Sequence, residues 1–277
     1  MQKIKTRIGI FGGSGFYNLL EKIEEIKIPT PYGYPSDKIA ICKVKNTNVA
    51  FLPRHGKGHI YPPHLIPYLA NLYAFKKLGV TRIIAPTAAG SLKASIKPGD
   101  FVICDQFVDR TWGRVDSYFQ GKNSKPRFSQ GGVVHISPSD PYCKELKSIA
   151  YLACQKLKYN CHPKGTVVVI NGPRFSTKAE SVWYQNQGWD VINMTQYPEV
   201  VLAKELGICY VNISLITDYD TGLKGNPNIK PVTTKDAFEL FNKNIDRVKK
   251  LILYMIEEIP EKHSCSCRNS LESAVVN

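Results

Sequence analysis

Short apolar runs alternate along the chain with segments in which apolar residues recur at helical spacing. The apolar runs predict strands at residues 7–11, 39–44, 49–52, 82–86, 101–108, 165–170, 190–194 and 208–216. The other segments predict helices at 65–78, from Asp140-Pro141 onward, from the capping box Thr177-x-x-Glu180 to Gly188, and at 200–206. This alternation predicts an α/β fold, a single domain with a mixed, mostly parallel central sheet flanked by helices.

The last helical pattern has an apolar residue every three or four positions, which predicts one amphipathic helix packed on the sheet. Its stripe consists of Phe238, Phe241, Ile245, Val248, Ile252, Met255 and Ile259. The residues beyond 260 are polar. We therefore expect one domain over 1–260 and a polar tail over 261–277.

The tail contains Cys265-Ser266-Cys267, two of the eight cysteines in the chain. No C-x-x-C pair is present, which argues against zinc ribbons and thioredoxin-type motifs. Four cysteines lie among apolar residues and are expected to be buried thiols: Cys42, Cys104, Cys154 and Cys209. The C-x-C segment itself is interpreted either as redox-active, as pairing with an upstream cysteine such as Cys209, or as an exposed tail.

The formal net charge is +14, with 43% hydrophobic and 22% charged residues. Because Lys and Arg are scattered and no nucleic-acid module is recognisable, we expect no nucleic-acid partner and interpret the charge as a basic surface around a small anion site. No apolar run approaches the roughly 18 residues of a membrane span, and no signal peptide is recognisable. The protein is expected to be cytoplasmic, without a membrane partner.

Polar residues follow several predicted strands, where open α/β sheets bind their ligands. They are Ser14, Arg54, Thr87, Thr195 and Asp218. The glycine turn around Ser14 lacks the third glycine of a dinucleotide site, because position 18 is Asn18, and it also lacks a P-loop lysine. The turn is therefore interpreted as a possible anion-binding loop or as a plain tight turn.

The segment LPRHGKGHIYPPH supplies Arg54 and His55. A zinc pair of His55 and His59 is disfavoured, because Gly56 and Gly58 break a helix there. Arginine binds phosphate in a bidentate fork, and a neutral His55 would add a donor. This segment therefore indicates an anion site, and no metal is expected.

Two carboxylates, Asp218 and Asp220, end the strand at 208–216, where side chains two residues apart point the same way. Phe175 precedes a capped helix and could stack on a flat ligand or pack in the core. Together these residues offer a cation and hydroxyls for phosphate, an aromatic ring, and a paired acid.

The motifs GGSGF, RHGKGH, TAAGSL, PGDFVICDQFVDRT, GPRFST, DVINMTQYPEVVLAKELGICY and TDYDTG occur in the order and spacing of the purine nucleoside phosphorylase family, which the chain resembles up to about residue 260. The C-x-C tail lies outside the common pattern and resembles thermophilic archaeal members. The family splits a nucleoside with inorganic phosphate, releasing the base and a sugar 1-phosphate. The resemblance implies homotrimers or homohexamers built as dimers of trimers.

The resemblance also implies a role for individual residues. Phosphate is expected at Ser14, Arg54, His55, Thr87, the backbone of Ala88, and Thr195. The nucleoside is expected at Met194 beside the sugar, Phe175 and Ser176 against the base, Asp218 and Asp220 at the base edge, and His135 supplied by a neighbouring subunit. Asp218, Asp220, Arg54 and His55 are the expected catalytic residues, with no metal or organic cofactor required.

Adenine leaves poorly as an anion, so the reaction needs a proton at N7. A neutral Asp218 could donate it while its other oxygen accepts from the 6-amino group, and Asp220 nearby would help to keep Asp218 protonated. This pair argues for 6-aminopurine nucleosides, and the resemblance implies S-methyl-5′-thioadenosine as the substrate. Alternatives are a phosphorylase that prefers adenosine or inosine, a nucleoside hydrolase, and a non-catalytic nucleoside-binding protein.

Overall fold

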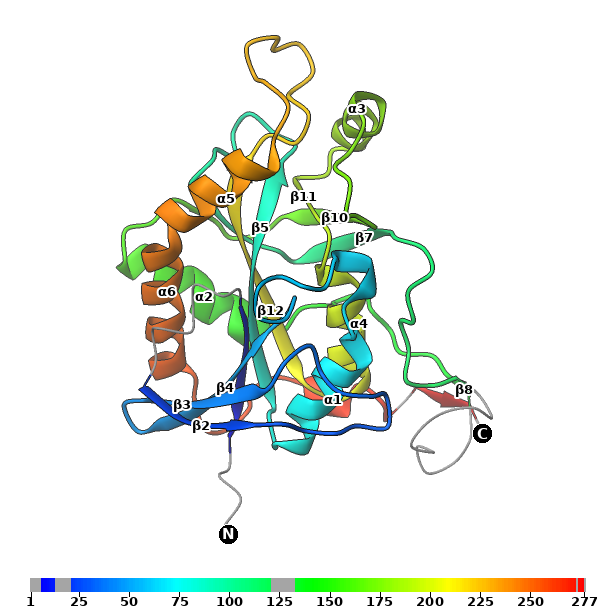
Figure 1. Ribbon diagram of the computed structural model, residues 1–277, viewed down its shortest axis with the longest axis vertical. Coiled ribbons are helices and arrows are strands. Elements are labelled where there is room, and N and C mark those ends of the chain that lie inside the picture. Colours follow the sequence, from blue (N-terminus) through cyan, green and yellow to red (C-terminus); the bar gives the residue numbers. More distant parts are fainter. Residues whose placement is uncertain (1–5, 13–20, 121–132, 273, 277) are drawn as a thin grey trace.

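The computed structural model describes residues 6–12, 21–120, 133–272 and 274–276 of the chain (Figure 1). Its strands are β1 (Ile8–Gly12), β2 (Glu21–Ile26), β3 (Ile39–Val44), β4 (Thr47–Pro53), β5 (Arg82–Ser91), β6 (Phe101–Ile103), β7 (Gln106–Arg110), β8 (Val133–Val134), β9 (Cys161–His162), β10 (Thr166–Ile170), β11 (Val191–Asn193), β12 (Cys209–Asp218) and β13 (Val275–Val276). Its helices are α1 (Tyr68–Lys77), α2 (Lys144–Lys156), α3 (Lys178–Asn186), α4 (Gln196–Glu205), α5 (Thr234–Lys243) and α6 (Ile245–Glu258), with short 3-10 helices η2 (Pro63–Leu65) and η4 (Cys267–Asn269). Within these described segments, no helix is both long and apolar enough to cross a membrane.

Strand β5 is the branch point of the main sheet, whose order is β2-β3-β4-β1-β5-β11-β10-β7. The first half of β5 pairs in parallel with β1, and β12 pairs with it along nearly its whole length. The end of β5 pairs with β11 in antiparallel orientation, and β12 continues to β6 and then β9. The fold is therefore the mixed, mostly parallel α/β sheet flanked by helices that the sequence predicts.

Helices cover both faces of this sheet, as Figure 1 shows for α2 and α6 on one side and α1 and α4 on the other. Alternate residues of each central strand enter different cores, because side chains in a strand alternate between faces. Ile84 packs with α2 and α6, whereas its neighbours Ile83 and Ala85 pack with α1 and α4. Burial on both faces explains why these strands are continuous apolar runs in the sequence.

The predicted strand at 82–86 is too short, because β5 continues to Ser91. Beyond Pro86, β12 still pairs with it from Thr87 to Gly90, and β11 pairs with its last two residues. Thr87 therefore lies inside a strand rather than after one. The predicted strand at 101–108 is in fact two strands, β6 and β7. They separate at Asp105, whose carboxylate and backbone N–H both bind Gly165.

Three helix predictions are wrong at their boundaries, one of them α4, which begins at Gln196 rather than residue 200. Helix α1 begins at Tyr68 rather than residue 65, because Pro67 is its N-cap and the preceding residues form η2. Helix α2 begins at Lys144 rather than at Asp140-Pro141. The chain stays non-helical up to Cys143, whose N–H donates to the Tyr210 carbonyl of β12. The capping box of Thr177 and Glu180 that opens α3 is confirmed.

The C-terminal stripe, predicted as one helix, forms two helices that break at Asn244. The Asn244 side chain donates to the Leu240 carbonyl at 2.9 Å and accepts from Arg247 at 2.7 Å. An Asn side chain that bonds to nearby backbone competes with the helix ladder, which explains the break. Consequently α6 packs on the sheet as expected, but Phe238 on α5 remains 49% exposed.

Candidate active site

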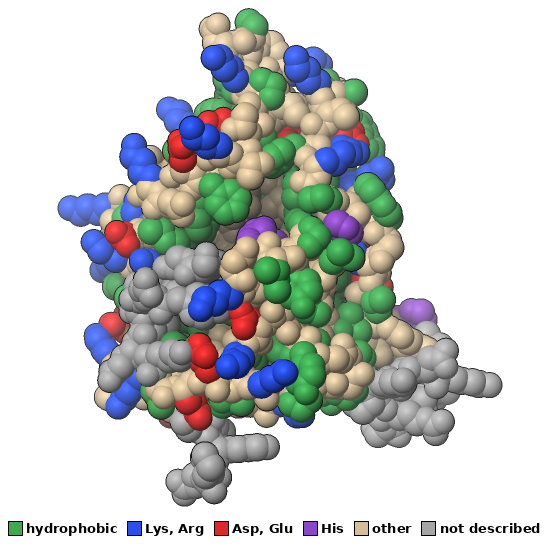
Figure 2. All heavy atoms as spheres, in the orientation of Figure 1, with side chains coloured by type: hydrophobic (Ala, Val, Ile, Leu, Met, Phe, Trp, Pro, Cys, Tyr) green, Lys and Arg blue, Asp and Glu red, His purple; other side chains and the backbone are tan. Residues whose placement is uncertain are grey.

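A cavity of about 650 Å³ lies at the carboxyl ends of β1, β4, β5, β11 and β12. That volume is in the range of small-molecule sites. Figure 2 shows a hollow near the middle of the molecule, with histidine side chains in it and apolar side chains around it. Most of the predicted site residues line this cavity together: Arg54, His55, Thr87, Ala88, Phe175, Met194, Thr195, Asp218 and Asp220.

Arg54 supplies a buried, permanent positive charge at one end of the cavity and is only 4% exposed. Its Nε and Nη2 donate to both carboxylate oxygens of Glu199, and its Nη1 donates to the Pro86 carbonyl at 3.2 Å. Burial by itself would lower the pKa of Arg54, but the Glu199 carboxylate more than reverses this and raises it. The remaining guanidinium hydrogens are available for an anion, because arginine has five N–H donors.

Glu199 is the residue that fixes the Arg54 guanidinium, and sequence reasoning missed it. It is fully buried near the start of α4, and it also accepts a 2.8 Å hydrogen bond from the Tyr210 hydroxyl. In the sequence, the one sign of this role is an acid directly before the apolar run at 200–203. An acid at such a position is more simply interpreted as facing solvent. The structure shows that this acid fixes the orientation of Arg54 from behind the cavity.

His55 is held as a neutral side chain beside Arg54. Burial lowers its pKa to about 3, and the neighbouring rings and charge of His59 and Arg54 add to this. Its Nδ1 lies 2.9 Å from the Tyr61 carbonyl oxygen, which can only accept, so the ring proton is on Nδ1. Nε2 then carries no hydrogen and can only accept. The His55 N–H that was expected to donate to an anion donates to the Tyr61 carbonyl instead.

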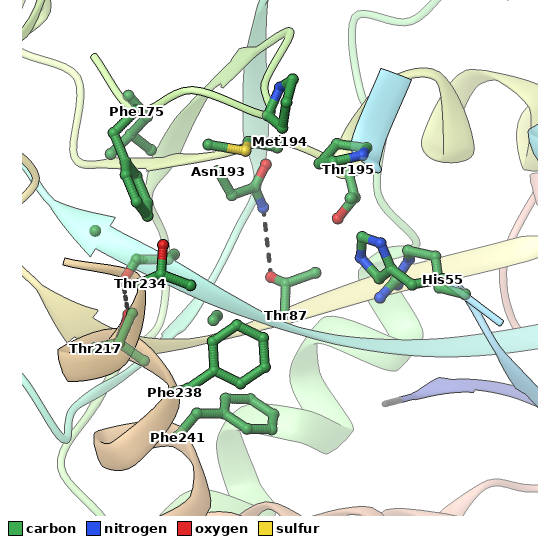
Figure 3. Close-up of a pocket in the computed structure, with 18 of the residues that line it drawn as sticks. His55, Thr87, Phe175, Asn193, Met194, Thr195, Thr217, Thr234, Phe238 and Phe241 are labelled. Atoms are coloured by element: carbon green, nitrogen blue, oxygen red, sulfur yellow. Dashed lines mark hydrogen bonds between the residues drawn. The ribbon is translucent and has the colours of Figure 1, made fainter. Parts of the chain in front are cut away.

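Thr87 projects from the middle of β5 into a network of amides. Asn212 Nδ2 donates to Thr87 Oγ1 at 3.1 Å, and Asn193 Nδ2 does so at 3.4 Å, as the dashed line in Figure 3 shows for Asn193. Thr87 Oγ1 also lies 3.4 Å from Ser214 Oγ, which itself donates to Asn212 Oδ1. Two incoming donors occupy the lone pairs of the Thr87 hydroxyl, so its hydrogen points to Ser214 or to a ligand in the cavity. Both asparagines were missed in the sequence, because each lies inside an apolar strand.

Thr195 adds a second hydroxyl on the same side of the cavity as His55 (Figure 3). It is the N-cap of α4, and its side chain makes no capping hydrogen bond. Ala88 also lines the cavity from β5. Ser14 lies outside the described residues, whereas Gly12, at the end of β1, lines the cavity.

The two carboxylates meet at the other end of the cavity, although not by strand alternation alone. β12 ends at Asp218, and Asp220 follows in a left-handed conformation with φ of 52°. Asp218 Oδ1 accepts from the Asp220 N–H at 2.7 Å, and its Oδ2 accepts from the Thr217 hydroxyl at 2.6 Å. Both side chains still line the same cavity.

Burial is the main reason why both acids resist ionisation. It raises the pKa of Asp220 to about 6, and the nearby Asp218 charge contributes to the rise. Burial also raises the pKa of Asp218, partly opposed by its bonds from Thr217 and Asp220. Desolvation therefore causes most of the rise in pKa that the sequence analysis attributed to repulsion between the two carboxylates.

Apolar side chains separate the cationic and acidic ends. Figure 3 shows Phe175 on the far side of the cavity from His55. Met194 lies above the cavity in this view, and Phe238 and Phe241 project from α5 below it. The two phenylalanines were assigned to the core stripe of the last helix. Both line the cavity, and Phe241 also packs against the core that contains α2 and α6. Helix α5 therefore contributes a hydrophobic wall.

Two predicted residues are outside this lining. Ser176 is buried next to Asp220, whose pKa its hydroxyl influences. His135 is exposed and follows β8, and its N–H donates to the Ala274 carbonyl at 2.8 Å. Figure 1 shows β8 at the edge of the molecule, away from α5, so His135 does not complete the cavity of its own chain.

Residues 7–257 match the family model of the phosphorylase superfamily. The chain is 49% identical over 271 residues to S-methyl-5′-thioadenosine phosphorylase of Nitrosopumilus maritimus (strain SCM1), covering 97% of this chain and 98% of that protein. It is also 40% identical over 271 residues to purine nucleoside phosphorylase of Streptomyces coelicolor, covering 97% and 95%.

The fold is similar to that of a solved structure of a mutant adenosine/methylthioadenosine phosphorylase from Schistosoma mansoni in complex with methylthioadenosine. The TM-score is 0.87, with 34% sequence identity and coverage of 97% of this chain and 96% of that chain.

Proposed function

Because the chain belongs to the phosphorylase superfamily, we propose that it catalyses the phosphorolysis of S-methyl-5′-thioadenosine to adenine and 5-methylthioribose 1-phosphate. It is then a pentosyltransferase of nucleoside salvage. The observation that carries the proposal is one cavity with a fixed cation and hydroxyls at one end and two poorly ionised carboxyls at the other. That arrangement suits an anionic nucleophile and a base that must leave with a proton.

Phosphate is assigned to the cationic end. Arg54 and the hydroxyls of Thr87 and Thr195 donate to its oxygens, together with the Ala88 backbone and Ser14. His55 Nε2, as an acceptor, takes the hydrogen of a monoprotonated phosphate. These groups stabilise the developing positive charge on the sugar by positioning the anion beneath it, without a metal or organic cofactor.

The purine is assigned to the acidic end, with Phe175 and Ser176 against the ring. Asp218 donates its proton to N7 while the bond between C1′ and N9 breaks and the electron pair moves into the base. A phosphate oxygen then bonds to C1′. Because a carboxylic acid can both donate to N7 and accept from the 6-amino group, Asp218 and Asp220 favour 6-aminopurines over inosine.

The sugar is assigned to the region between them, beside Met194. The apolar wall of Phe238 and Phe241 favours a methylthio group over the 5′-hydroxyl of adenosine, because a hydroxyl buried there would lose hydrogen bonds to water. His135 is assigned to the cavity of a neighbouring subunit in a homotrimer or dimer of trimers. We place this assembly in the cytoplasm.

The proposed function is tested by incubating the purified protein with S-methyl-5′-thioadenosine, adenosine or inosine, each with and without phosphate. Release of adenine that requires phosphate, fastest from the methylthio substrate, supports the proposal. Release at the same rate without phosphate would identify a hydrolase. Absence of turnover for every nucleoside would identify a binding protein.

The acidic end also predicts a pH dependence. Burial raises the pKa of Asp220 to about 6, and the pKa of Asp218 is also raised. The pair therefore keeps a proton at pH values where an ordinary carboxyl group is ionised, and it loses this proton as the pH rises further. We expect kcat/KM for the nucleoside, at saturating phosphate, to fall as the pH rises above about 6. A profile that rises over the same range would contradict the general-acid role.

Gly90 predicts a second, local effect. A Cβ at this position would come within 2.8 Å of Asp218 Oδ1 and 3.0 Å of Ile192 Cγ2. The substitution Gly90→Ala should displace the Asp218 carboxylate and lower kcat/KM for the nucleoside by about tenfold or more, since a 1 Å misplacement of a catalytic group is costly. The KM for phosphate should stay the same, because Arg54 lies at the other end. A changed phosphate KM with unchanged nucleoside kinetics would contradict this assignment.

A further inference from the structure

The four cysteines that the sequence predicts to be buried thiols are all buried: Cys42, Cys104, Cys154 and Cys209. Cys209 lies near the C-terminal tail, with its Sγ 3.3 Å from Cys265 Sγ. This distance is longer than an S–S bond of about 2.05 Å, so their pairing stays a prediction. Cys104 has a different setting, because it follows β6 and its polar neighbours connect it with Thr87. It therefore belongs to a polar network next to the active site.

Strand pairing places the members of this network. Thr87 on β5 lies opposite Ser214 on β12, and Asn212, two residues earlier in β12, projects from the same face. This face of β12 meets the start of α4, whose first residue is Gln196. All four side chains are buried, and of the four only Thr87 lines the cavity. Ser214, Asn212 and Gln196 can therefore influence a ligand only through residues that line the cavity.

The Ser214 hydroxyl has more donors around it than it can accept. Its own hydrogen is used, because Ser214 donates to Asn212 Oδ1 at 2.8 Å. Its oxygen can accept two hydrogen bonds. Three donors lie within reach of this oxygen: Gln196 Nε2 at 3.3 Å, Thr87 Oγ1 at 3.4 Å and Cys104 Sγ at 3.5 Å. Three donors for two lone pairs mean that one hydrogen has to point elsewhere.

Gln196 is held in place and occupies one of these lone pairs. The buried Tyr142 hydroxyl donates to Gln196 Oε1, which fixes the orientation of the amide. The amide nitrogen then donates to Ser214 Oγ, and at 3.4 Å also to Cys104 Sγ. Because an amide has two N–H hydrogens, it can make both bonds. The second lone pair of Ser214 is therefore left to either Thr87 or Cys104.

Cys104 can replace Thr87 as the donor to Ser214. Burial raises the pKa of the Cys104 thiol to about 11, so it keeps its hydrogen at neutral pH. A hydroxyl is a stronger donor than a thiol, so without an anion Thr87 takes the second lone pair of Ser214. An oxyanion is a stronger acceptor than a neutral hydroxyl, so a bound phosphate draws the Thr87 hydrogen into the cavity. The Cys104 S–H then binds the lone pair that Thr87 leaves.

We propose that Ser214 and Cys104 are positioning residues for Thr87, which let its hydroxyl hydrogen turn from Ser214 to phosphate without leaving a buried acceptor unpaired. The inference rests on the proposed function, in which Thr87 donates to phosphate. Neither positioning residue touches the substrate, because neither lines the cavity. Their effect is therefore confined to the binding of phosphate.

The test measures adenine release from S-methyl-5′-thioadenosine by the full chain at increasing phosphate concentration. Cys104→Ala removes the replacement donor and should raise the KM for phosphate about two- to tenfold, the range for one neutral hydrogen bond, with kcat nearly unchanged. Cys104→Ser keeps a donor and should restore a KM near that of the wild type. The matched control is Cys154→Ala, which changes a buried thiol of α2 away from the cavity and should leave the phosphate KM as it is.

Ser214→Ala separates this role from a merely structural one. It removes the acceptor that competes with phosphate, so the phosphate KM should not rise, although the free energy of unfolding should fall because Asn212 Oδ1 loses its donor. In the Ser214→Ala background, Cys104→Ala should no longer raise the phosphate KM.

Three results would overturn the proposal: an unchanged phosphate KM in Cys104→Ala, an equal rise with and without Ser214, or a raised KM in Ser214→Ala alone. The last of these needs no cysteine variant, so the proposal stays testable if Cys104→Ala does not fold. Adenine release by the wild type that does not require phosphate would instead contradict the proposed function itself, so the two failures are distinct.

Discussion

Asp218→Asn should lower kcat/KM for S-methyl-5′-thioadenosine at least about a hundredfold, the lower range for losing a general acid. The amide keeps the size of the side chain and can still accept from the 6-amino group, but it has no acidic proton for N7. The Asp220 N–H and the Thr217 hydroxyl donate to different oxygens of Asp218, so one of them loses its acceptor in the amide. The Thr217 hydroxyl has a second acceptor in the Ala89 carbonyl, 3.4 Å away, which limits this loss. Initial rates of adenine release at saturating phosphate measure the effect.

A matched control for this change is Asp236→Asn. Asp236 is an exposed acid in the first turn of α5 whose charge reaches Asp218, but it does not line the cavity. The same chemical change there should leave the kinetics nearly unaltered. Inosine provides a second comparison, because an amide suits a 6-oxopurine, so Asp218→Asn should lose much less activity on inosine. Unchanged kinetics with the methylthio substrate would remove Asp218 from the proposed mechanism.

The fold could be predicted because strands that are buried on both faces of the sheet are continuous apolar runs in the sequence. Runs such as 165–170 and 208–216 could hardly be anything but central strands. Polar residues at their carboxyl ends then predicted one site, and Arg54, Thr195 and Asp218 do line one cavity. This inference works because strand ends in a parallel sheet converge on the same edge.

The residues that escaped prediction are those whose role depends on a partner far along the chain. Glu199 is explained by Arg54, 145 positions earlier, and Asn212 by Ala85 and Thr87 on the neighbouring strand. Phe238 has the spacing of a core residue, and periodicity cannot distinguish a helix face that packs on a sheet from one that lines a cavity. Pairing of this kind is set by the tertiary fold.

Arg54→Met should raise the KM for phosphate by about 10- to 100-fold, the effect of losing one or two charge-assisted hydrogen bonds of about 1.5–3 kcal/mol. It should also destabilise the protein by about 3–5 kcal/mol, because Glu199 would remain as an uncompensated buried charge. Urea unfolding and phosphate saturation curves measure the two effects separately. On its own, this variant cannot tell a weakened fold from a lost anion site.

The double variant Arg54→Met/Glu199→Gln separates these two effects. Replacing both partners removes the buried charge, and the new amide at position 199 can still accept from the Tyr210 hydroxyl, so most of the free energy of unfolding should return. The phosphate KM should nevertheless stay high, because the cation itself is gone. The single variant Glu199→Gln keeps the cation and should affect phosphate binding far less. If the double variant regained both stability and a normal phosphate KM, Arg54 would be a structural residue, and the anion would have to be bound by the hydroxyls and backbone of β5 and α4.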